Sequence, residues 1–230
     1  MNTQILLTIS LPILLCSVVI ATNLTDAEIL AFEPPKEILK NIPYYLSGYD
    51  EDGAPIYVVE LGKYDLRTIV ENGGENAKAL DIYLDQMFLS MAQNGRKSSA
   101  KQFILIADLE GFDMRQASHF PTIQLIISKF SRFEQVVGNG TMKQGWIVNA
   151  NFIWERVWQL ASPLLGALVN NVKVYGTNKE IWKPKLLKEL PRDQLPEWYG
   201  GVAGHKPVEI LGFREILLQV LKDRDQAVLG

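Results

Sequence analysis

Three acidic residues, Asp108, Glu110 and Asp113, follow directly on a strongly apolar segment, residues 103–107 (FILIA). A segment that is apolar at consecutive positions predicts a central parallel strand buried on both faces, and α/β proteins usually bind ligands at the carboxyl ends of such strands. A metal site or an acid/base site is therefore one hypothesis. We favour a structural interpretation, in which Asp113 caps the following helix, because no histidine or further carboxylate cluster joins the three.

Other signatures of catalysis are missing from the sequence. It contains no G-x-S-x-G elbow, no Walker A sequence and no H-E-x-x-H, and His119 and His205 are its only histidines. Asp50 and Asp52 faintly resemble a calcium loop, but the spaced ligands and the closing glutamate are absent, so we interpret them as turn residues. We therefore expect a binding protein rather than an enzyme, with no metal and no cofactor. A hydrolase using the three carboxylates is a distant alternative.

The composition indicates one α/β domain with appendages. The chain has 230 residues, of which 47% are hydrophobic and 21% charged. Its 23 Lys and Arg nearly balance its 26 Asp and Glu, so it lacks the electrostatic footprint of a protein that binds duplex DNA. We expect no nucleic-acid partner, and we expect a monomer.

The amino terminus reads as a hydrophobic leader. Residues 5–21 carry no charge and are mostly apolar, which suits a signal peptide better than a transmembrane helix of about 20 residues. We expect a leader over residues 1–22 that is cleaved; an uncleaved anchor and an unused leader are the alternatives. Cleavage would remove Cys16, the only cysteine, and would leave no thiol. The glycosylation sequons at Asn23 and Asn139 matter only if the chain enters the secretory route.

A strand, a helix and a second strand are predicted between residues 145 and 178. Residues 146–148 and 172–175 are β-prone, and the stretch between them suits a right-handed parallel crossover. The helix, residues 152–169, should break near Ser162 because Pro163 cannot donate a backbone hydrogen bond. Seven apolar residues lie on one of its faces: Trp154, Val157, Trp158, Ala161, Leu164, Leu165 and Leu168. This helix is either an ordinary core helix or a lid over an apolar ligand cavity.

The remaining elements follow from local patterns. We predict a β-hairpin around the turn at residues 49–55 and a short helix capped by Asp65. Two longer helices are predicted at residues 76–93, closed by Asn94-Gly95, and at residues 116–137. Lysines alternate with apolar residues from residue 179 to residue 190, which indicates a solvated helix face or a contact for anionic headgroups. Residues 213–221, in a C-terminal tail (residues 205–230), form an amphipathic segment that should dock on the domain.

The order of several short motifs resembles the CRAL-TRIO lipid-binding domain family, which includes retinaldehyde-binding, tocopherol-transfer and phosphatidylinositol/phosphatidylcholine exchange proteins. The likeness runs from about residue 34 to residue 204. The motifs occur in the order typical of that family: residues 48–57 (GYDEDGAPIY), 62–65 (GKYD), 108–111 (DLEG), 147–150 (IVNA), 158–165 (WQLASPLL), 172–176 (VKVYG) and 195–201 (LPEWYGG).

This resemblance implies a three-layer αβα sandwich. Its mostly parallel, mixed sheet would form the floor of an apolar pocket, and the segment around residues 154–168 would be a mobile gate helix. The expected function is the binding and transfer of a retinoid, a tocopherol, a phospholipid or a phosphoinositide, with transient contact to a membrane surface. The alternative is a membrane-associated interaction module with a ligand-free pocket. The leader indicates the secretory route or membrane anchoring, whereas the resemblance indicates the cytosol and peripheral membrane.

The expected site residues lie on the two central strands and on the gate helix. The resemblance also implies Lys185 as a headgroup contact, because some phosphoinositide-binding members have a lysine near this position. The expected pocket and gate residues are Ile104, Ile106, Trp146, Val148, Phe152, Trp154, Val157, Trp158, Ala161, Leu164, Leu165 and Leu168.

Overall fold

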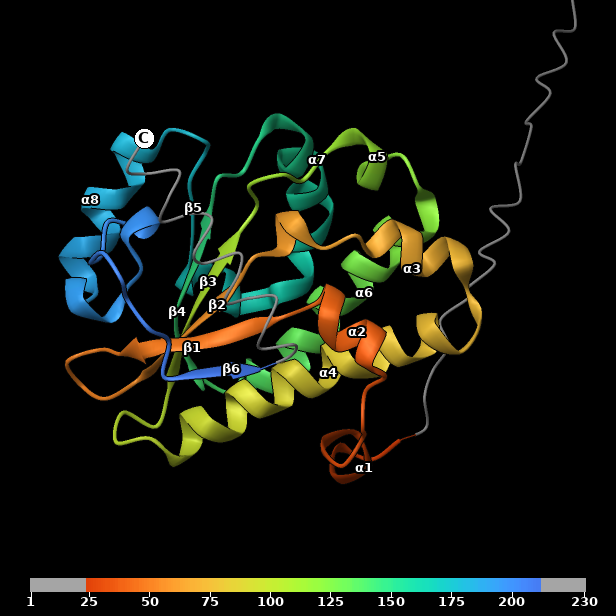
Figure 1. Cartoon of the computed structure of the whole chain (residues 1–230), viewed down its shortest axis with the longest axis horizontal. Coiled ribbons are helices and arrows are strands. Elements are labelled where there is room, and N and C mark those ends of the chain that lie inside the picture. The colour runs from red at the N-terminus through yellow and green to blue at the C-terminus, as the bar shows by residue number, and fades with distance from the viewer. Residues whose placement is uncertain (1–23, 212–230) are drawn as a thin grey trace, which may run out of the picture.

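The computed structural model describes residues 24–211, which fold around a six-stranded sheet of order β5-β4-β3-β2-β1-β6 (Figure 1). Its strands are β1 (Tyr44–Tyr49), β2 (Pro55–Val59), β3 (Phe103–Asp108), β4 (Met142–Val148), β5 (Val172–Val174) and β6 (Glu209–Leu211). β2, β3, β4 and β5 pair in parallel, and β1 pairs antiparallel with both β2 and β6. The predicted mostly parallel, mixed sheet is confirmed.

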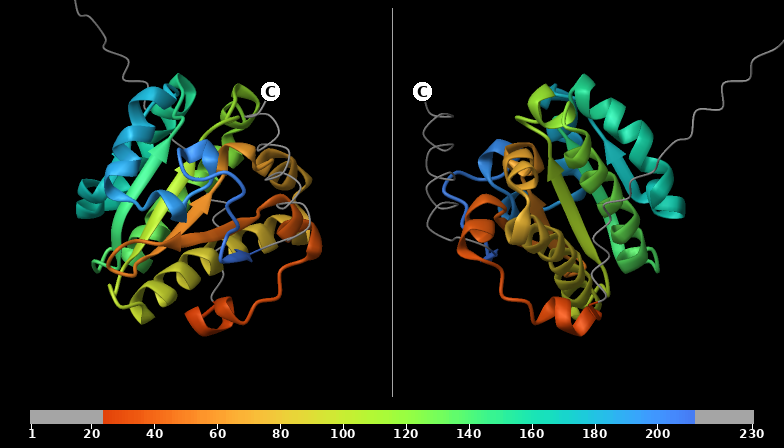
Figure 2. Two further views of the ribbon diagram at one scale, coloured as in Figure 1. Left: turned by 60° about the vertical axis from the view of Figure 1, so that its left-hand side comes forward. Right: turned by 90° about the vertical axis from the view of Figure 1, so that its right-hand side faces the viewer.

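Helices cover both faces of the sheet, so the architecture has the three predicted layers (Figures 1 and 2). One face carries most of the helices: α3 (Leu66–Asn72), α4 (Gly74–Lys97), α5 (Met114–Ala117), α6 (Phe120–Val137), α7 (Phe152–Ala161) and the 3₁₀ segment η2 (Ser162–Asn171), with α1 (Asp26–Leu30) and α2 (Lys36–Asn41) at its border. The other face carries α8 (Lys179–Glu189), η3 (Arg192–Gln194) and η4 (Glu197–Tyr199). A short 3₁₀ turn, η1 (Leu61–Lys63), follows β2. Two apolar cores result, one on each side of the sheet.

The hairpin between β1 and β2 confirms the predicted turn at residues 49–55. The Asp50 carboxylate accepts hydrogen bonds from the backbone N–H groups of Asp52 and Ala54, and Gly53 adopts a positive φ of 80°. The Lys143 ammonium lies 2.5 Å from a carboxylate oxygen of Asp50 and 2.5 Å from one of Asp52. The acidic pair that faintly resembled a calcium loop therefore serves the turn and an ion pair with β4.

The predicted helix at residues 116–137 is two helices in the structure. α5 ends at Ala117 and α6 starts at Phe120, with Pro121 in its first turn. Proline has no backbone N–H, so it fits the first turn, where that donor has no helical partner, but not a longer helix running through it. The error in the prediction came from reading the apolar pattern across this proline.

The predicted end of α4 at Asn94-Gly95 is also wrong, because the helix continues to Lys97. Gly95 serves close packing instead of termination. A Cβ atom at this position would lie 3.1 Å from the backbone nitrogen of Phe103 at the start of β3. The C-terminal end of α4 can therefore pack closely against the start of the central strand β3.

The three carboxylates after β3 have structural partners. Asp108 is buried and accepts hydrogen bonds from the Asn149 amide (2.8 Å) and the Tyr199 hydroxyl (2.8 Å). Glu110 pairs with Lys179 at 2.8 Å, and Asp113 caps α5 by accepting from the Gln116 N–H. Within residues 24–211 they form no group that could hold a metal ion. Asp108 thus connects the end of β3 by hydrogen bonds to the loop after β4 and to η4.

We predict that Tyr199→Phe lowers the free energy of unfolding by about 2 kcal/mol. The ring is retained, while the buried Asp108 carboxylate loses a hydrogen-bond donor. Tyr49→Phe, at an exposed position on β1, is the matched control and should change stability by less than about 0.5 kcal/mol. Urea denaturation of both variants measures the difference. Equal stabilities would show that the bond to Asp108 contributes nothing.

Candidate ligand-binding cavity

An apolar cavity of about 130 Å³ lies between the sheet and the helical layer that contains α4, α6 and α7. Its floor comes from β2 to β5 and its walls from the helices. Residues from the sheet side are Val59, Leu105, Ala107, Met142, Gly145, Trp146, Ile147 and Val172, with Leu61 and Tyr64 from the segment after β2. Residues from the helical side are Leu66, Leu84, Met87, Phe88, Met91, Leu125, Ile126, Lys129, Phe130, Phe133, Trp154, Trp158 and Leu165.

The floor uses alternate residues of the two central strands. Successive side chains of a strand point to opposite faces, and Leu105 and Ala107 of β3 border the cavity. Ile104 and Ile106, which were predicted for the pocket, lie in the second core under α8. A strand that is apolar at every position carries no signal for which residues face which layer, so the sequence did not distinguish Leu105 and Ala107 from Ile104 and Ile106.

β4 shows the same alternation. Ile147 faces the cavity, whereas the predicted Val148 lies in the second core. Trp146 borders the cavity, but its ring stacks on Tyr175 at 5.6 Å in the second core, and the Lys173 ammonium lies 4.8 Å from the ring centre. The structure therefore does not bring Ile104, Ile106 and Val148 to the cavity.

The predicted gate segment breaks where the sequence indicated. α7 ends at Ala161, and a 3₁₀ segment containing Pro163 begins at Ser162. Asn151 fixes the start of α7, because its side-chain oxygen accepts from the N–H groups of Ile153 and Trp154 and its amide donates to the Phe112 carbonyl at 2.6 Å. The segment is thus anchored at its first turn and broken in its middle.

Three of the predicted gate residues line the cavity: Trp154, Trp158 and Leu165. Trp154 packs edge-on against Phe112 at 5.2 Å, and Trp158 packs in the same way against Phe130 at 5.9 Å. The other predicted residues of the segment do not line it. Val157, Ala161 and Leu168 are buried elsewhere, while Phe152 and Leu164 are 72% and 39% exposed.

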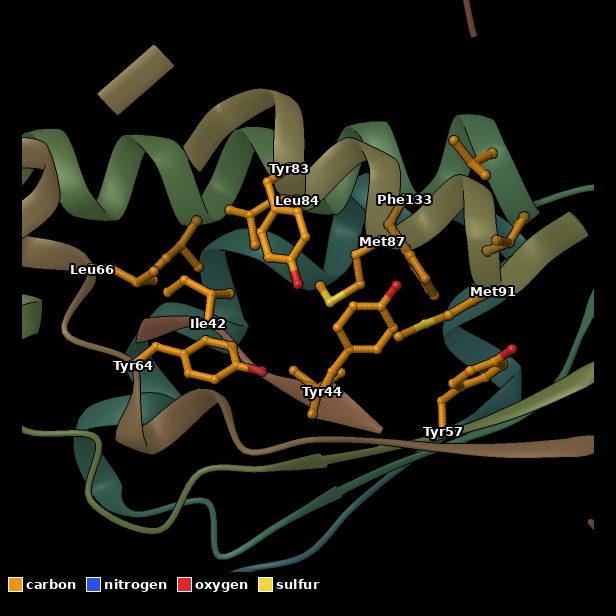
Figure 3. Close-up of a cluster of buried hydrophobic side chains, with 14 of the residues drawn as sticks. Ile42, Tyr44, Tyr57, Tyr64, Leu66, Tyr83, Leu84, Met87, Met91 and Phe133 are labelled. Carbon is orange, nitrogen blue, oxygen red and sulfur yellow. The ribbon is translucent and has the colours of Figure 1, made fainter. Parts of the chain in front are cut away.

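Sequence reasoning did not assign the opposite wall to the site. α4 contributes Leu84, Met87, Phe88 and Met91, and α6 contributes a second row that includes Phe130. Figure 3 shows Met87 and Met91 pointing from α4 toward Tyr44 of the sheet. The apolar stripe on α4 was visible in the sequence, but a stripe at helical spacing indicates burial without distinguishing a core from a ligand cavity.

One charged side chain, Lys129 of α6, belongs to the cavity lining. Its ammonium lies 2.6 Å from Asp85 and 2.7 Å from Asp81, both on α4, and it donates to the Asp81 carbonyl at 2.8 Å. Arg132 approaches Asp85 at 3.5 Å and Asp26 at 2.7 Å. Burial raises the pKa of Asp85 above its ordinary value, although the charge of Lys129 acts in the opposite direction. This cluster joins α4 to α6 behind the apolar lining.

The expected headgroup residue, Lys185, lies on the other side of the sheet from the cavity. Lys185 belongs to α8, and its ammonium lies 5.1 Å from the centre of the Tyr175 ring.

Of the two glycosylation sequons, Asn139 is exposed in the turn after α6. Asn23, the leader at residues 1–22 and the amphipathic stretch at residues 213–221 lie outside the described residues. The part of the tail that is described contains β6, a strand the sequence analysis did not predict.

Together, the fold and the cavity describe an α/β protein with an apolar cavity enclosed between its sheet and a broken helix. The CRAL/TRIO domain matches residues 39–201 of the chain. The chain therefore belongs to the CRAL/TRIO family of lipid-binding and lipid-transfer proteins, which confirms the resemblance drawn from its motifs. None of the helices within residues 24–211 has the length and apolar character needed to cross a bilayer.

Individual relatives are distant. The chain is 22% identical over 187 residues to CRAL-TRIO domain-containing protein YKL091C of Saccharomyces cerevisiae, covering 78% of this chain and 58% of that protein. It is 24% identical over 181 residues to SEC14 cytosolic factor of Yarrowia lipolytica (76% and 36%). It is 23% identical over 189 residues to phosphatidylinositol/phosphatidylcholine transfer protein SFH7 of Arabidopsis thaliana (77% and 33%). The chain thus spans between 33% and 58% of the length of these curated relatives.

The fold also occurs among solved structures. The crystal structure of Sfh5 superposes with a TM-score of 0.54 at 13% identity, covering 86% of this chain and 69% of that one. At this identity the likeness is one of fold, and it agrees with the αβα architecture described above.

Proposed function

We propose that this protein binds a lipid-like molecule in the cavity and transfers it between membranes. The observation that carries the proposal is the position of the apolar cavity directly beneath the broken helix α7–η2, which contributes Trp154, Trp158 and Leu165 to its lining. Each methylene group removed from water contributes about 0.8 kcal/mol, so one long chain supplies ample affinity without covalent chemistry. Membership of a generally non-catalytic family and the names of the phosphatidylinositol/phosphatidylcholine transfer relatives support the same function. We assign it to residues 34–204.

The gate would have to move to admit a ligand. A cavity of about 130 Å³ is smaller than the roughly 300–1,000 Å³ typical of sites for small molecules. Displacement of α7–η2 would enlarge it. Phe152 and Leu160 are 72% and 64% exposed on the outside of α7 and would meet the bilayer during exchange. The small volume also supports the second candidate, an interaction module whose pocket is filled by its own side chains.

Native mass spectrometry of the purified protein, followed by solvent extraction, separates the two candidates. A retinoid, a tocopherol or a phospholipid bound at one molecule per chain would establish carriage and name the ligand class. A protein that is empty after purification and takes up nothing from mixed-lipid vesicles would favour the interaction module.

Gly166 provides a second test of the gate. It interrupts η2 with φ 50° and ψ −131°, a backbone conformation that favours glycine, and a Cβ atom there would meet no atom within 4 Å. Gly166→Ala should therefore strain the closed conformation by about 1–3 kcal/mol without a steric clash. We expect lipid exchange between vesicles to become about tenfold faster.

Gly204→Ala is the matched control for this variant. Gly204 also has a positive φ, 68°, and also has open space where a Cβ atom would be, but it lies in the loop before β6. Its substitution should lower stability similarly and leave exchange unchanged. Equal acceleration in both variants would mean that general destabilisation, not opening of the gate, sets the exchange rate.

A further inference from the structure

The Lys129 ammonium donates all of its hydrogen bonds to other groups of the protein. An ammonium group has three N–H donors, and that of Lys129 has three acceptors at 2.6–2.8 Å, namely one oxygen of Asp85 and two of Asp81. No other charged residue belongs to the lining of the cavity in the described part of the chain. A ligand in the cavity therefore meets no cation that is available to it.

The cluster around Lys129 offers a ligand no surplus of positive charge. Asp81 and Asp85 balance the charges of Lys129 and Arg132, and Arg132 also pairs with the exposed Asp26 at 2.7 Å. Charges interact more strongly in an apolar, weakly polarisable environment than in water. A phosphate or carboxylate placed in the cavity would thus lose its hydration without gaining a cationic partner.

On the helical side, the lining has one neutral donor that is fully buried and without a partner among the described residues. Trp154 is 1% exposed, and its indole N–H is buried without a hydrogen-bond partner among the described residues. The Tyr64 hydroxyl, by contrast, already donates to the Pro43 carbonyl at 2.6 Å. The indole N–H of Trp146 is also unpartnered, but its ring lies in the second core against Tyr175. A neutral oxygen on a ligand would satisfy Trp154 without bringing charge into the cavity.

From these contacts we infer that the cavity selects an uncharged hydrophobic molecule with a neutral oxygen, such as an alcohol, a carbonyl or an ester, and excludes lipids that must bury an anionic headgroup. The inference rests on the proposed carrier function and narrows its ligand class. It departs from the phosphatidylinositol that appears in the name of the Arabidopsis relative SFH7. Lys185 lies on α8, across the sheet from the cavity, so it does not supply the cavity with a cation for an anionic headgroup.

Three ligands with the same hydrocarbon chain test the inference: hexadecane, hexadecanol and palmitate. Their binding to the full chain is measured at pH 8, where palmitate is ionised, by displacement of an uncharged fluorescent lipid probe. We expect hexadecanol to bind about tenfold more tightly than palmitate. Palmitate binding as tightly as hexadecanol would overturn the inference and leave the carrier function intact. A chain that binds neither the probe nor any of the three ligands would overturn the carrier function and the inference with it.

The Trp154→Phe variant tests the hydrogen bond separately. It keeps an aromatic ring and removes the N–H, so hexadecanol should bind about fivefold more weakly while hexadecane changes less than about twofold. Trp182→Phe is the control, because Trp182 is equally buried with an unpartnered N–H but lies on α8 in the second core. It should change neither affinity. An equal loss for both ligands in Trp154→Phe would mean that Trp154 acts through packing alone, and it would overturn its assignment as the donor.

Discussion

Lys129→Met should lower the free energy of unfolding by about 3–5 kcal/mol, the range found when one partner of a buried ion pair is removed. Methionine replaces the aliphatic stem that borders the cavity, so the change in apolar packing is small. The loss comes from Asp85, which is 7% exposed and, among residues 24–211, keeps only Arg132, at 3.5 Å, as a cationic partner. α4 and α6 would also lose their polar connection behind the cavity.

The size of this loss should depend on pH. Burial already raises the pKa of Asp85 in the folded protein, and removal of Lys129 removes the main influence that lowers it. Between the unfolded and the raised folded pKa, the folded state binds more protons than the unfolded state, so stability falls as pH rises through that window. The deficit of the variant should therefore be larger at pH 8 than at pH 5.

Urea denaturation at both pH values measures this effect. Lys173→Met is the control, because Lys173 pairs with Glu189 at a half-exposed position on the other side of the molecule. Its stability should change by less than about 1 kcal/mol. A deficit in Lys129→Met as small as that of the control, or one that grows toward acidic pH, would contradict the importance of the buried pair.

The sequence was most informative where a residue type has one structural use. Pro163 predicted the break in the gate segment, Asp65 predicted the cap of α3, and both occur in the structure. These effects are local, because a missing N–H or a capping carboxylate acts within one helical turn. Gly95 shows the limit of this reasoning: the glycine that suggested a helix end permits close contact with β3, which only the tertiary fold reveals.

The site was harder to predict than the fold because residues of a packed core and residues that contact a ligand show the same apolar pattern in the sequence. β3 is apolar at every position from Phe103 to Ala107, so its sequence could not tell Leu105, on the cavity side, from Ile104, on the α8 side. The apolar residues of the α4 wall likewise show burial in the sequence without showing whether they meet a ligand. Lys129 gave no signal, since a single lysine in an amphipathic helix usually faces water; its partners Asp81 and Asp85 lie on α4, more than 40 residues earlier in the chain.

Trp158→Asp is expected to reduce loading of a fluorescent lipid by at least about tenfold. Trp158 is half-buried on α7, lines the cavity and packs edge-on against Phe130 on the opposite wall. A carboxylate there would have to lose its hydration in an apolar cavity whose one charged lining residue, Lys129, is already engaged. Water drawn in by the carboxylate would also weaken contacts with the lipid chain.

Leu160→Asp separates loss of the cavity from loss of the gate surface. Leu160 lies two residues further along α7 and is 64% exposed, so the same charge there stays in water. With lipid delivered from ethanol rather than from a bilayer, Leu160→Asp should load as the parent does, and circular dichroism should show both variants folded. If Trp158→Asp also loads normally, the lipid binds elsewhere and the cavity is packed core. If only Trp158→Asp fails to load, the inner face of α7 holds the ligand. If Leu160→Asp loads normally from ethanol but poorly from vesicles, the outer face of α7 contacts the membrane during exchange.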